Sequence, residues 1–289
     1  MCLVRRGWAR KRKSGLPDGT DGSSRRPNDG APTLASRLDR MNGAIALVGS
    51  GEFTSAMIDV DRGLLAATGK DMPRVAIVPA ASWPDGEAVY DRWMAQGEEH
   101  FAALGAEPLP IRLRDLTTAH DAATLAGIDQ ADLVYFSGGK PGYLLSLLRD
   151  TEAGAALTRA RSRGAVIAGC SAGAMILGSH QLAMGGLRPT HLSVSWQESL
   201  GFVPGIVIVP HYDAIPEALL MPLILAAPKG DLVVGIDENT ALVGGSDAGG
   251  SGRDGEWQVQ GRGRVTVWHG SRRKRYRAGA GPVTLHVIG

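Results

Sequence analysis

Residues Gly164 to Gly178 read Gly-Ala-Val-Ile-Ala-Gly-Cys-Ser-Ala-Gly-Ala-Met-Ile-Leu-Gly, and this stretch decides the fold. The apolar run 165–168 predicts a buried strand, Gly169 to Gly173 form a G-x-S-x-G turn, and 174–177 predict the start of a helix. A residue on so sharp a turn has a strained backbone, and side chains two positions before and after it would collide with the strand and the helix. The stretch therefore predicts that Ser171 projects from a strand-turn-helix corner.

The alternative is a chance match in a glycine-rich turn, because 40 of the 289 residues are glycine. The strand before the pentapeptide and the small-residue helix after it favour a nucleophile. N–H groups at the start of such a helix can stabilise a developing oxyanion.

The composition narrows the class of protein. Apolar residues make up 44% of the chain, and no run reaches about 18 apolar residues, so we expect no transmembrane helix and no membrane partner. The two cysteines, Cys2 and Cys170, support neither a disulfide framework nor a zinc site and fit a reducing compartment. We therefore expect a cytoplasmic protein without metal or cofactor.

The charge is uneven along the chain. The net charge is +2, with a net +6 in residues 1–40 and −4 in the remainder, so the body of the protein predicts no affinity for nucleic acid. Residues 1–40 lack hydrophobic periodicity and an apolar signal segment. We interpret them as a disordered basic tail or as sequence upstream of a true start at Met41. Residues 41–289 are then expected to form a single α/β domain, with a late β segment at about 232–289.

From residue 41 onward, strand-like and helix-like segments alternate. This alternation predicts a mostly parallel sheet with helices on both faces, and short antiparallel strands closing one edge at the C-terminal end. Near that end, 232–236 and 241–243 are expected to pair as strands around Asp237-Glu238-Asn239. The other predicted strands are 44–48, 75–78, 109–113, 133–136, 206–209, 257–259, 265–268 and 283–288, and the predicted helices are 55–68, 87–104, 119–125, 143–148, 152–163 and 216–227.

Ligand sites in such sheets lie beyond the carboxyl ends of the strands. Of the seven histidines, His211 alone ends an apolar strand at the edge expected for Ser171, so it is the candidate general base. The N–H of Ala172 and an N–H of the Gly138-Gly139 turn are the candidate oxyanion donors. Gly49-Ser50-Gly51 is a further turn expected to line the site.

These motifs, together with Gly235-Ile236-Asp237-Glu238-Asn239-Thr240-Ala241, resemble the cyanophycinase and dipeptidase E family of serine peptidases. The resemblance covers about 44–243 and implies a class I glutamine amidotransferase-like fold. It implies Ser171 as nucleophile, His211 as base, and Gly139 with Ala172 as the oxyanion hole. It also implies metal-independent hydrolysis of peptide bonds next to aspartyl residues.

The chain departs from the family pattern at two places. Family enzymes carry an acidic residue soon after the serine, whereas 179–197 contain no Asp or Glu. Either Asp213 in His-x-Asp, which we favour, or Glu198 completes the triad, or the triad is incomplete. Cyanophycinases carry Gly-Gly-Asp-Gln where this chain has Gly138-Gly139-Lys140-Pro141, and they carry arginines just after the histidine. Cyanophycin is therefore not the expected substrate, and Lys140 is a candidate for binding a substrate carboxylate.

Three hypotheses follow. The first is a serine hydrolase that cleaves a small peptide or amide next to an acidic group. The second is a catalytically silent binding protein that keeps the elbow for structure, and the third is glutamine amide transfer through Cys170. The flanking glycines are symmetric about Ser171, so Cys170 is interpreted as a small buried residue. A homodimer is left open.

Overall fold

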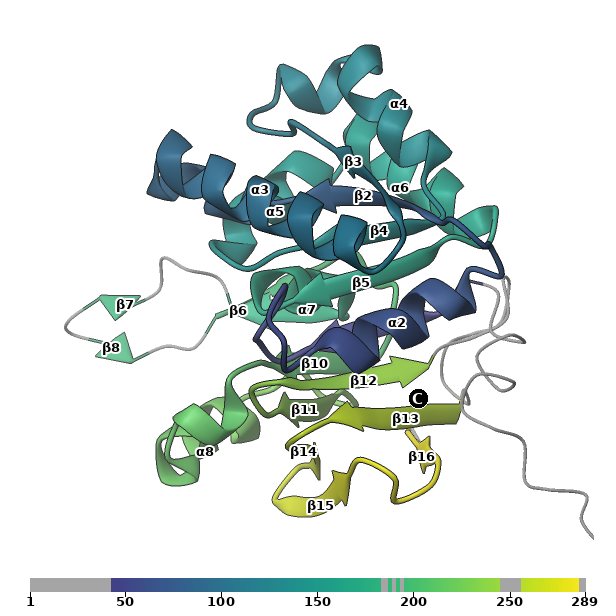
Figure 1. Ribbon diagram of the computed structural model, residues 1–289. Helices are drawn as coiled ribbons and strands as arrows, with labels where there is room; N and C mark the ends of the chain where they lie inside the picture. The colour runs from purple at the N-terminus through teal and green to yellow at the C-terminus, as the bar shows by residue number, and fades with distance from the viewer. Residues whose placement is uncertain (1–42, 183–186, 189–190, 193–194, 245–255, 286–289) are drawn as a thin grey trace, which may run out of the picture. The chain divides into compact units, whose positions relative to one another are not determined.

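Five adjacent parallel strands, four of them short apolar runs, form one part of the larger sheet and reach one of its edges (Figure 1). Their order across the sheet is β1 (Ile45–Val48), β5 (Val166–Cys170), β4 (Leu133–Phe136), β2 (Arg74–Val78) and β3 (Glu107–Pro110). All residues of β1, β4 and β5 are buried, which explains why these strands read as continuous apolar runs. Antiparallel strands β12 (Thr240–Gly244), β13 (Glu256–Gly261) and β16 (Val283–Thr284) continue the sheet beyond β1.

The computed structural model describes residues 43–182, 187–188, 191–192, 195–244 and 256–285, all of which belong to a unit spanning residues 32–289. The expectations for residues 1–40, and for the last residues of the predicted strand 283–288, lie outside these ranges. Within them, no helix has the length and apolar character needed to cross a bilayer.

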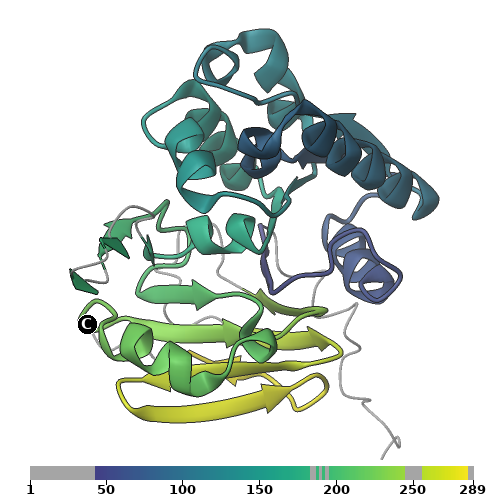
Figure 2. The same ribbon diagram turned by 90° about the vertical axis from the view of Figure 1, so that its left-hand side faces the viewer.

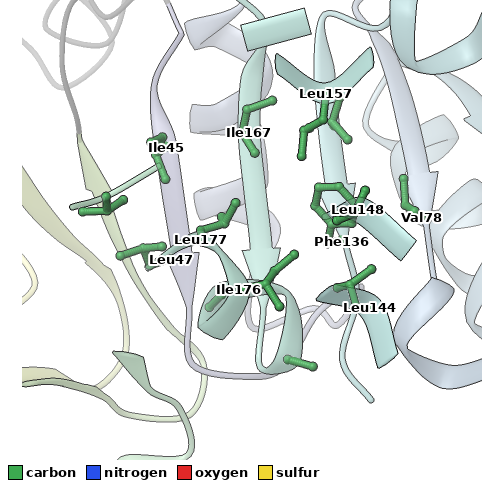
Figure 3. Close-up of a cluster of buried hydrophobic side chains, with 14 of the residues drawn as sticks. Ile45, Leu47, Val78, Phe136, Leu144, Leu148, Leu157, Ile167, Ile176 and Leu177 are labelled. Carbon is green, nitrogen blue, oxygen red and sulfur yellow. The ribbon is translucent and has the colours of Figure 1, made fainter. Parts of the chain in front are cut away.

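Side chains alternate between the two faces of the larger sheet. Ala46 and Val48 point into one apolar cluster with helices α2 (Ile58–Ala67) and α3 (Glu87–Ala103). Ile45 and Leu47 point into a second cluster on the other face (Figure 3). The helices of that second face are α4 (Ala122–Gln130), α5 (Pro141–Leu148), α6 (Glu152–Ser162) and α7 (Ala172–Leu177).

A second, smaller sheet shares this second face. Its order is β15 (Arg272–Arg277), β14 (Arg264–His269), β11 (Leu232–Ile236), β10 (Ile206–Val209), β6 (His180–Leu182) and β9 (Trp196–Glu198). Ile208 and Val234 join the core of the larger sheet, whereas Val207 and Val233 pack with α8 (Glu217–Leu225) on the opposite side. The later strands, drawn from green to yellow, gather at one end of the ribbon, and α3 to α6 lie at the other (Figure 2). A short pair, β7 (Leu187–Arg188) and β8 (His191–Leu192), completes the strands in the described ranges.

The predicted fold class, a mostly parallel sheet with helices on both faces and added antiparallel strands, is confirmed. One predicted pairing is wrong. β11 and β12 do not pair with each other, because β11 lies between β10 and β14 in the smaller sheet and β12 lies between β1 and β13 in the larger one. Residues 237–239 therefore cross from one sheet to the other.

Candidate active site

The elbow places Ser171 between the end of β5 and the start of α7. Its backbone has φ 51° and ψ −110°, outside the regions that ordinary residues favour. A Cβ on Gly169 would collide with the carbonyl of Gly173, and a Cβ on Gly173 would lie 2.7 Å from the carbonyl oxygen of Phe136. The Ser171 N–H is fixed by a 2.9 Å bond to the carbonyl of Val48 on β1. Glycines on both sides are therefore needed for this close packing.

His211 follows β10 and contacts the serine. Its Nε2 lies 2.9 Å from Ser171 Oγ, and its backbone is left-handed, with φ 51° and ψ 36°. The side chain of His211 is 39% exposed, so the imidazole is accessible from solvent. Because β10 belongs to the smaller sheet, the base approaches from a different sheet than the nucleophile. His100 and His180 each pair instead with an aspartate, Asp61 and Asp231.

The carboxylate in contact with His211 belongs to Glu238. This residue is not one of the two that the sequence predicted for the role. Glu238 Oε1 lies 2.9 Å from His211 Nδ1. Asp213 does not reach the imidazole and instead accepts a 2.8 Å hydrogen bond from the backbone N–H of Glu238. Glu198 is an exposed residue on the edge strand β9 and has no hydrogen bond or ion pair to His211 among the described residues. The expectation that Asp213 or Glu198 orients the histidine is therefore corrected in favour of Glu238.

The sequence did carry a signal for this residue. Glu238 lies two positions beyond the carboxyl end of β11, the same offset that separates His211 from the end of β10. β10 and β11 are parallel neighbours, so residues that follow their ends meet at one edge. The predicted pairing of 232–236 with 241–243 would instead place Glu238 at the tip of a turn, away from His211.

The two candidate oxyanion donors are the backbone N–H groups of neighbouring turns beside the serine. The N–H groups of Gly139 and Ala172 have no hydrogen-bond acceptor within the described part of the chain. The neighbouring Lys140 N–H is occupied, by a 2.7 Å bond to the carbonyl of Ala81. Gly139 has φ 140°, and a Cβ there would collide with the backbone of Ala81, so this turn also depends on glycine. Gly138 donates its N–H to Glu52, at 2.8 Å, and is not available as a donor.

Cys170 is completely buried, and its thiol binds Glu52 rather than the histidine. Its thiol donates a 2.8 Å hydrogen bond to Glu52 Oε2. Burial, and secondarily the charge of Glu52, raise the pKa of the Cys170 thiol well above its usual value. A neutral, buried thiol is a poor nucleophile, so the geometry does not favour amide transfer through Cys170.

Lys140 lies at the first position after the glycine turn and already has a partner. Its Nζ is 3.2 Å from Asp85 Oδ1, with both side chains more than a third exposed. Asp85 and Ala81 both belong to the 3₁₀ helix η1 (Ala80–Asp85), which therefore holds Lys140 by its backbone and by its side chain.

The described ranges contain no group of three or more His, Cys, Asp or Glu side chains arranged to hold a metal ion.

A mostly parallel sheet with a serine at its strand-turn-helix corner places the chain among proteins of the class I glutamine amidotransferase-like fold. The profile of Peptidase family S51 matches residues 45–248. The chain belongs to this family of serine peptidases.

Relatives and solved structures agree with this assignment. A cyanophycinase from Trichormus variabilis is 28% identical over 229 residues, covering 78% of this chain and 72% of that protein. A cyanophycinase from Geminocystis herdmanii is 27% identical over 200 residues, covering 68% and 69%. The crystal structure of a peptidase from an acI-B1 Actinobacterium has a TM-score of 0.73 at 27% identity, over 85% of this chain and 98% of that one. A peptidase E protein from Listeria monocytogenes has a TM-score of 0.50 at 18% identity, over 82% and 98%, and supports the fold.

Proposed function

We propose that the chain hydrolyses a small peptide or amide bond through a triad of Ser171, His211 and Glu238. The observation that carries this proposal is the position of His211, whose two ring nitrogens lie 2.9 Å from the serine hydroxyl and 2.9 Å from a carboxylate. A histidine that is hydrogen-bonded to the serine on one side and to a carboxylate on the other is the arrangement that activates a serine at neutral pH.

In this mechanism Ser171 Oγ attacks the carbonyl carbon of the substrate while His211 Nε2 takes the hydroxyl proton. Glu238 accepts a hydrogen bond from Nδ1–H, which fixes the tautomer and stabilises the imidazolium that forms. The N–H groups of Gly139 and Ala172 bind the negative oxygen of the tetrahedral intermediate. His211 then gives the proton to the leaving amine, and a water molecule, activated by the same imidazole, hydrolyses the acyl-enzyme and frees Ser171.

For the substrate, we propose a peptide or amide with an acidic group next to the cleaved bond. The support is Lys140, an exposed cation directly after the glycine turn that supplies an oxyanion donor. To bind a substrate carboxylate, Lys140 would exchange its contact with Asp85 for one with the substrate. An exposed ion pair is worth about 0–1 kcal/mol, so this exchange has a low cost.

The binding-protein alternative rested on the lack of an acidic residue after Ser171. The contact between Glu238 and His211 supports a complete triad instead, and we propose no second function.

The test is labelling by a fluorophosphonate, a reagent that reacts with activated serines. We expect the full-length protein to be labelled at Ser171, and Ser171→Ala to be inert to the reagent and to hydrolyse no aspartyl dipeptide. Lys229→Ala, an exposed position in the loop after α8, is the control and should label like the wild type. Labelling that persists in Ser171→Ala would reject the proposal.

A further inference from the structure

Glu52 is a buried carboxylate that the proposed mechanism does not use. It lies in the turn after β1, and only 7% of its surface is exposed. Its Oε1 accepts the backbone N–H of Gly138 at 2.8 Å, and its Oε2 accepts the thiol of Cys170 at 2.8 Å. The two partners lie 86 and 118 residues away along the chain. One carboxylate therefore joins three segments that are distant in sequence.

The register of the larger sheet explains why these segments meet. Strand β5 lies between β1 and β4, with Val48 of β1 opposite Cys170 and Phe136 of β4 opposite Gly169. The three strands are parallel and end nearly level. Consequently, the turns that follow them converge at one point beyond their carboxyl ends.

Glu52 fixes the turn that carries one of the proposed oxyanion donors. The N–H of Gly138 is bound to Glu52 and the N–H of Lys140 to the carbonyl of Ala81, so the peptide between them is anchored on both sides. The N–H of that peptide, from Gly139, is left without an acceptor in the described structure. Its direction is therefore set by the two flanking hydrogen bonds.

The other oxygen of Glu52 holds the elbow. Cys170 directly precedes the nucleophile, and a Cβ added to Gly138 would lie 3.3 Å from Ser171 Cβ. The carboxylate thus sets the separation between the glycine turn and the residue that forms the new bond. This separation determines whether the N–H groups of Gly139 and Ala172 converge on one oxygen.

We propose that Glu52 is a positioning residue of the oxyanion site, an inference that rests on the proposed function. It acts as a double acceptor that ties the Gly138–Gly139 turn to the elbow. Without it, the two N–H donors no longer point to the same place. Misplacement of a catalytic group by about 1 Å can cost 10²-fold in rate, and the loss falls on the transition state because the oxyanion exists only there.

The experiment measures fluorophosphonate labelling as two constants, the maximal inactivation rate kinact and the half-saturating concentration KI. In this reaction Ser171 Oγ bonds to phosphorus, fluoride leaves, and His211 takes the hydroxyl proton. The charge that develops on the phosphonyl oxygen uses the same N–H donors as a peptide oxyanion. Glu52→Met removes both acceptors at similar side-chain length, whereas Glu52→Gln keeps one oxygen to accept the Gly138 N–H.

We expect Glu52→Met to lower kinact by about 10²-fold with little change in KI, and Glu52→Gln to recover most of the rate. Asp61→Asn is the matched control, since Asp61 is a fully buried acid on α2 whose side chain binds His100 and has no hydrogen bond to Ser171, His211 or Gly139 within the described residues. Its kinact should equal that of the wild type even where its melting temperature falls. If Glu52→Met does not fold, Glu52→Asp replaces it, because the shorter side chain cannot span Gly138 N and Cys170 Sγ together.

The outcomes separate the two proposals. Absence of Ser171-dependent labelling in the wild type rejects the proposed function, and this inference with it. Ser171-dependent labelling with a folded Glu52→Met whose kinact is unchanged overturns the inference alone. So does an equal loss of kinact in Asp61→Asn, because the effect would then come from core stability rather than from the acceptor at Gly138.

Discussion

Replacing Glu238 by Gln tests the member of the triad that the sequence did not reveal. The substitution keeps the shape of the side chain and removes the negative charge that lies 2.9 Å from His211 Nδ1. The side chains of Glu238 and His211 are 43% and 39% exposed, so solvent screens their interaction. A pair of unit charges about 4 Å apart is worth about 1 kcal/mol in water and about 4 kcal/mol near a protein surface.

These limits correspond to a loss of about 5-fold to 10³-fold in kcat/KM, since 1.36 kcal/mol is a factor of ten in rate. The loss is smaller than the 10⁴ seen where the acid of a triad is buried. The assay is hydrolysis of an aspartyl dipeptide at neutral pH, with fluorophosphonate labelling as a second reading of serine activation.

Two variants complete this test. Asp213→Ala removes the acceptor for the Glu238 N–H and should cost less than Glu238→Gln, because Asp213 acts only through the backbone of Glu238. Glu198→Ala should retain full activity, since Glu198 does not contact His211. Near-normal activity in Glu238→Gln, combined with a large loss in Asp213→Ala, would show that the assignment of the carboxylate is wrong.

Two further predictions concern stability and substrate binding. The pKa of Cys170 is raised on folding by burial and then by Glu52, so its contribution to stability is complete below the unfolded pKa of about 8.5 and declines above it, by about 1.4 kcal/mol per pH unit. The free energy of unfolding is measured by urea denaturation at about pH 8 and about pH 10. Between these pH values it should fall less for Cys170→Ser than for the wild type. An equal fall in the two proteins would contradict the burial of the thiol. Lys140→Ala should raise KM for an acidic dipeptide by about two- to five-fold, while Asp85→Asn, which frees Lys140, should lower it. An equal effect on an uncharged dipeptide would argue against a carboxylate contact.

The core strands and the elbow could be predicted because local patterns determine them. The predicted strands 133–136, 206–209 and 232–236 coincide with β4, β10 and β11. Their residues are buried, so each reads as a short apolar run of strand length. The elbow was recognisable because its two glycines are required by close backbone packing, which leaves a mark in the sequence at fixed offsets.

The predicted boundaries differ from the observed ones where an N-cap or an edge position decides where an element begins. Helix α4 begins at Ala122 rather than 119, because the side chain of Asp121 accepts the N–H of Thr124 at 2.8 Å and acts as the N-cap. The predicted strand 109–113 is shifted to Glu107–Pro110. β3 contains Pro108 and Pro110, which lack an N–H donor, and it lies at the edge of its sheet, where missing donors are tolerated.

The spacing of Glu238 after its strand identifies it only if that strand is known to lie beside β10, and this depends on which sheet each flanking strand joins. The sequence 232–243 is compatible with a hairpin, in which two strands pair and their connection is a tip. In the structure the same strands enter different sheets, and Asn239 takes a left-handed backbone with φ 53° where the chain crosses. Sheet membership is decided by packing between segments far apart in sequence, and no local pattern records it.

The site therefore depends on the alignment of two sheets rather than on one. Ser171 follows a strand of the larger sheet, whereas His211 and Glu238 follow neighbouring strands of the smaller one. Both Ser171 and His211 have φ 51°, a conformation that costs about 1–3 kcal/mol for a residue other than glycine and persists only where its surroundings enforce it. The backbone of Ser171 is held by its hydrogen bond to Val48 and by the packing of the two flanking glycines. The side chain of His211 is held by its contact with Glu238. Residues 237–239 connect the two sheets directly, so the segment that supplies Glu238 also joins the sheet of the base to the sheet that carries the nucleophile. The two sheets also share one apolar core, which holds the base and the nucleophile within 2.9 Å of each other.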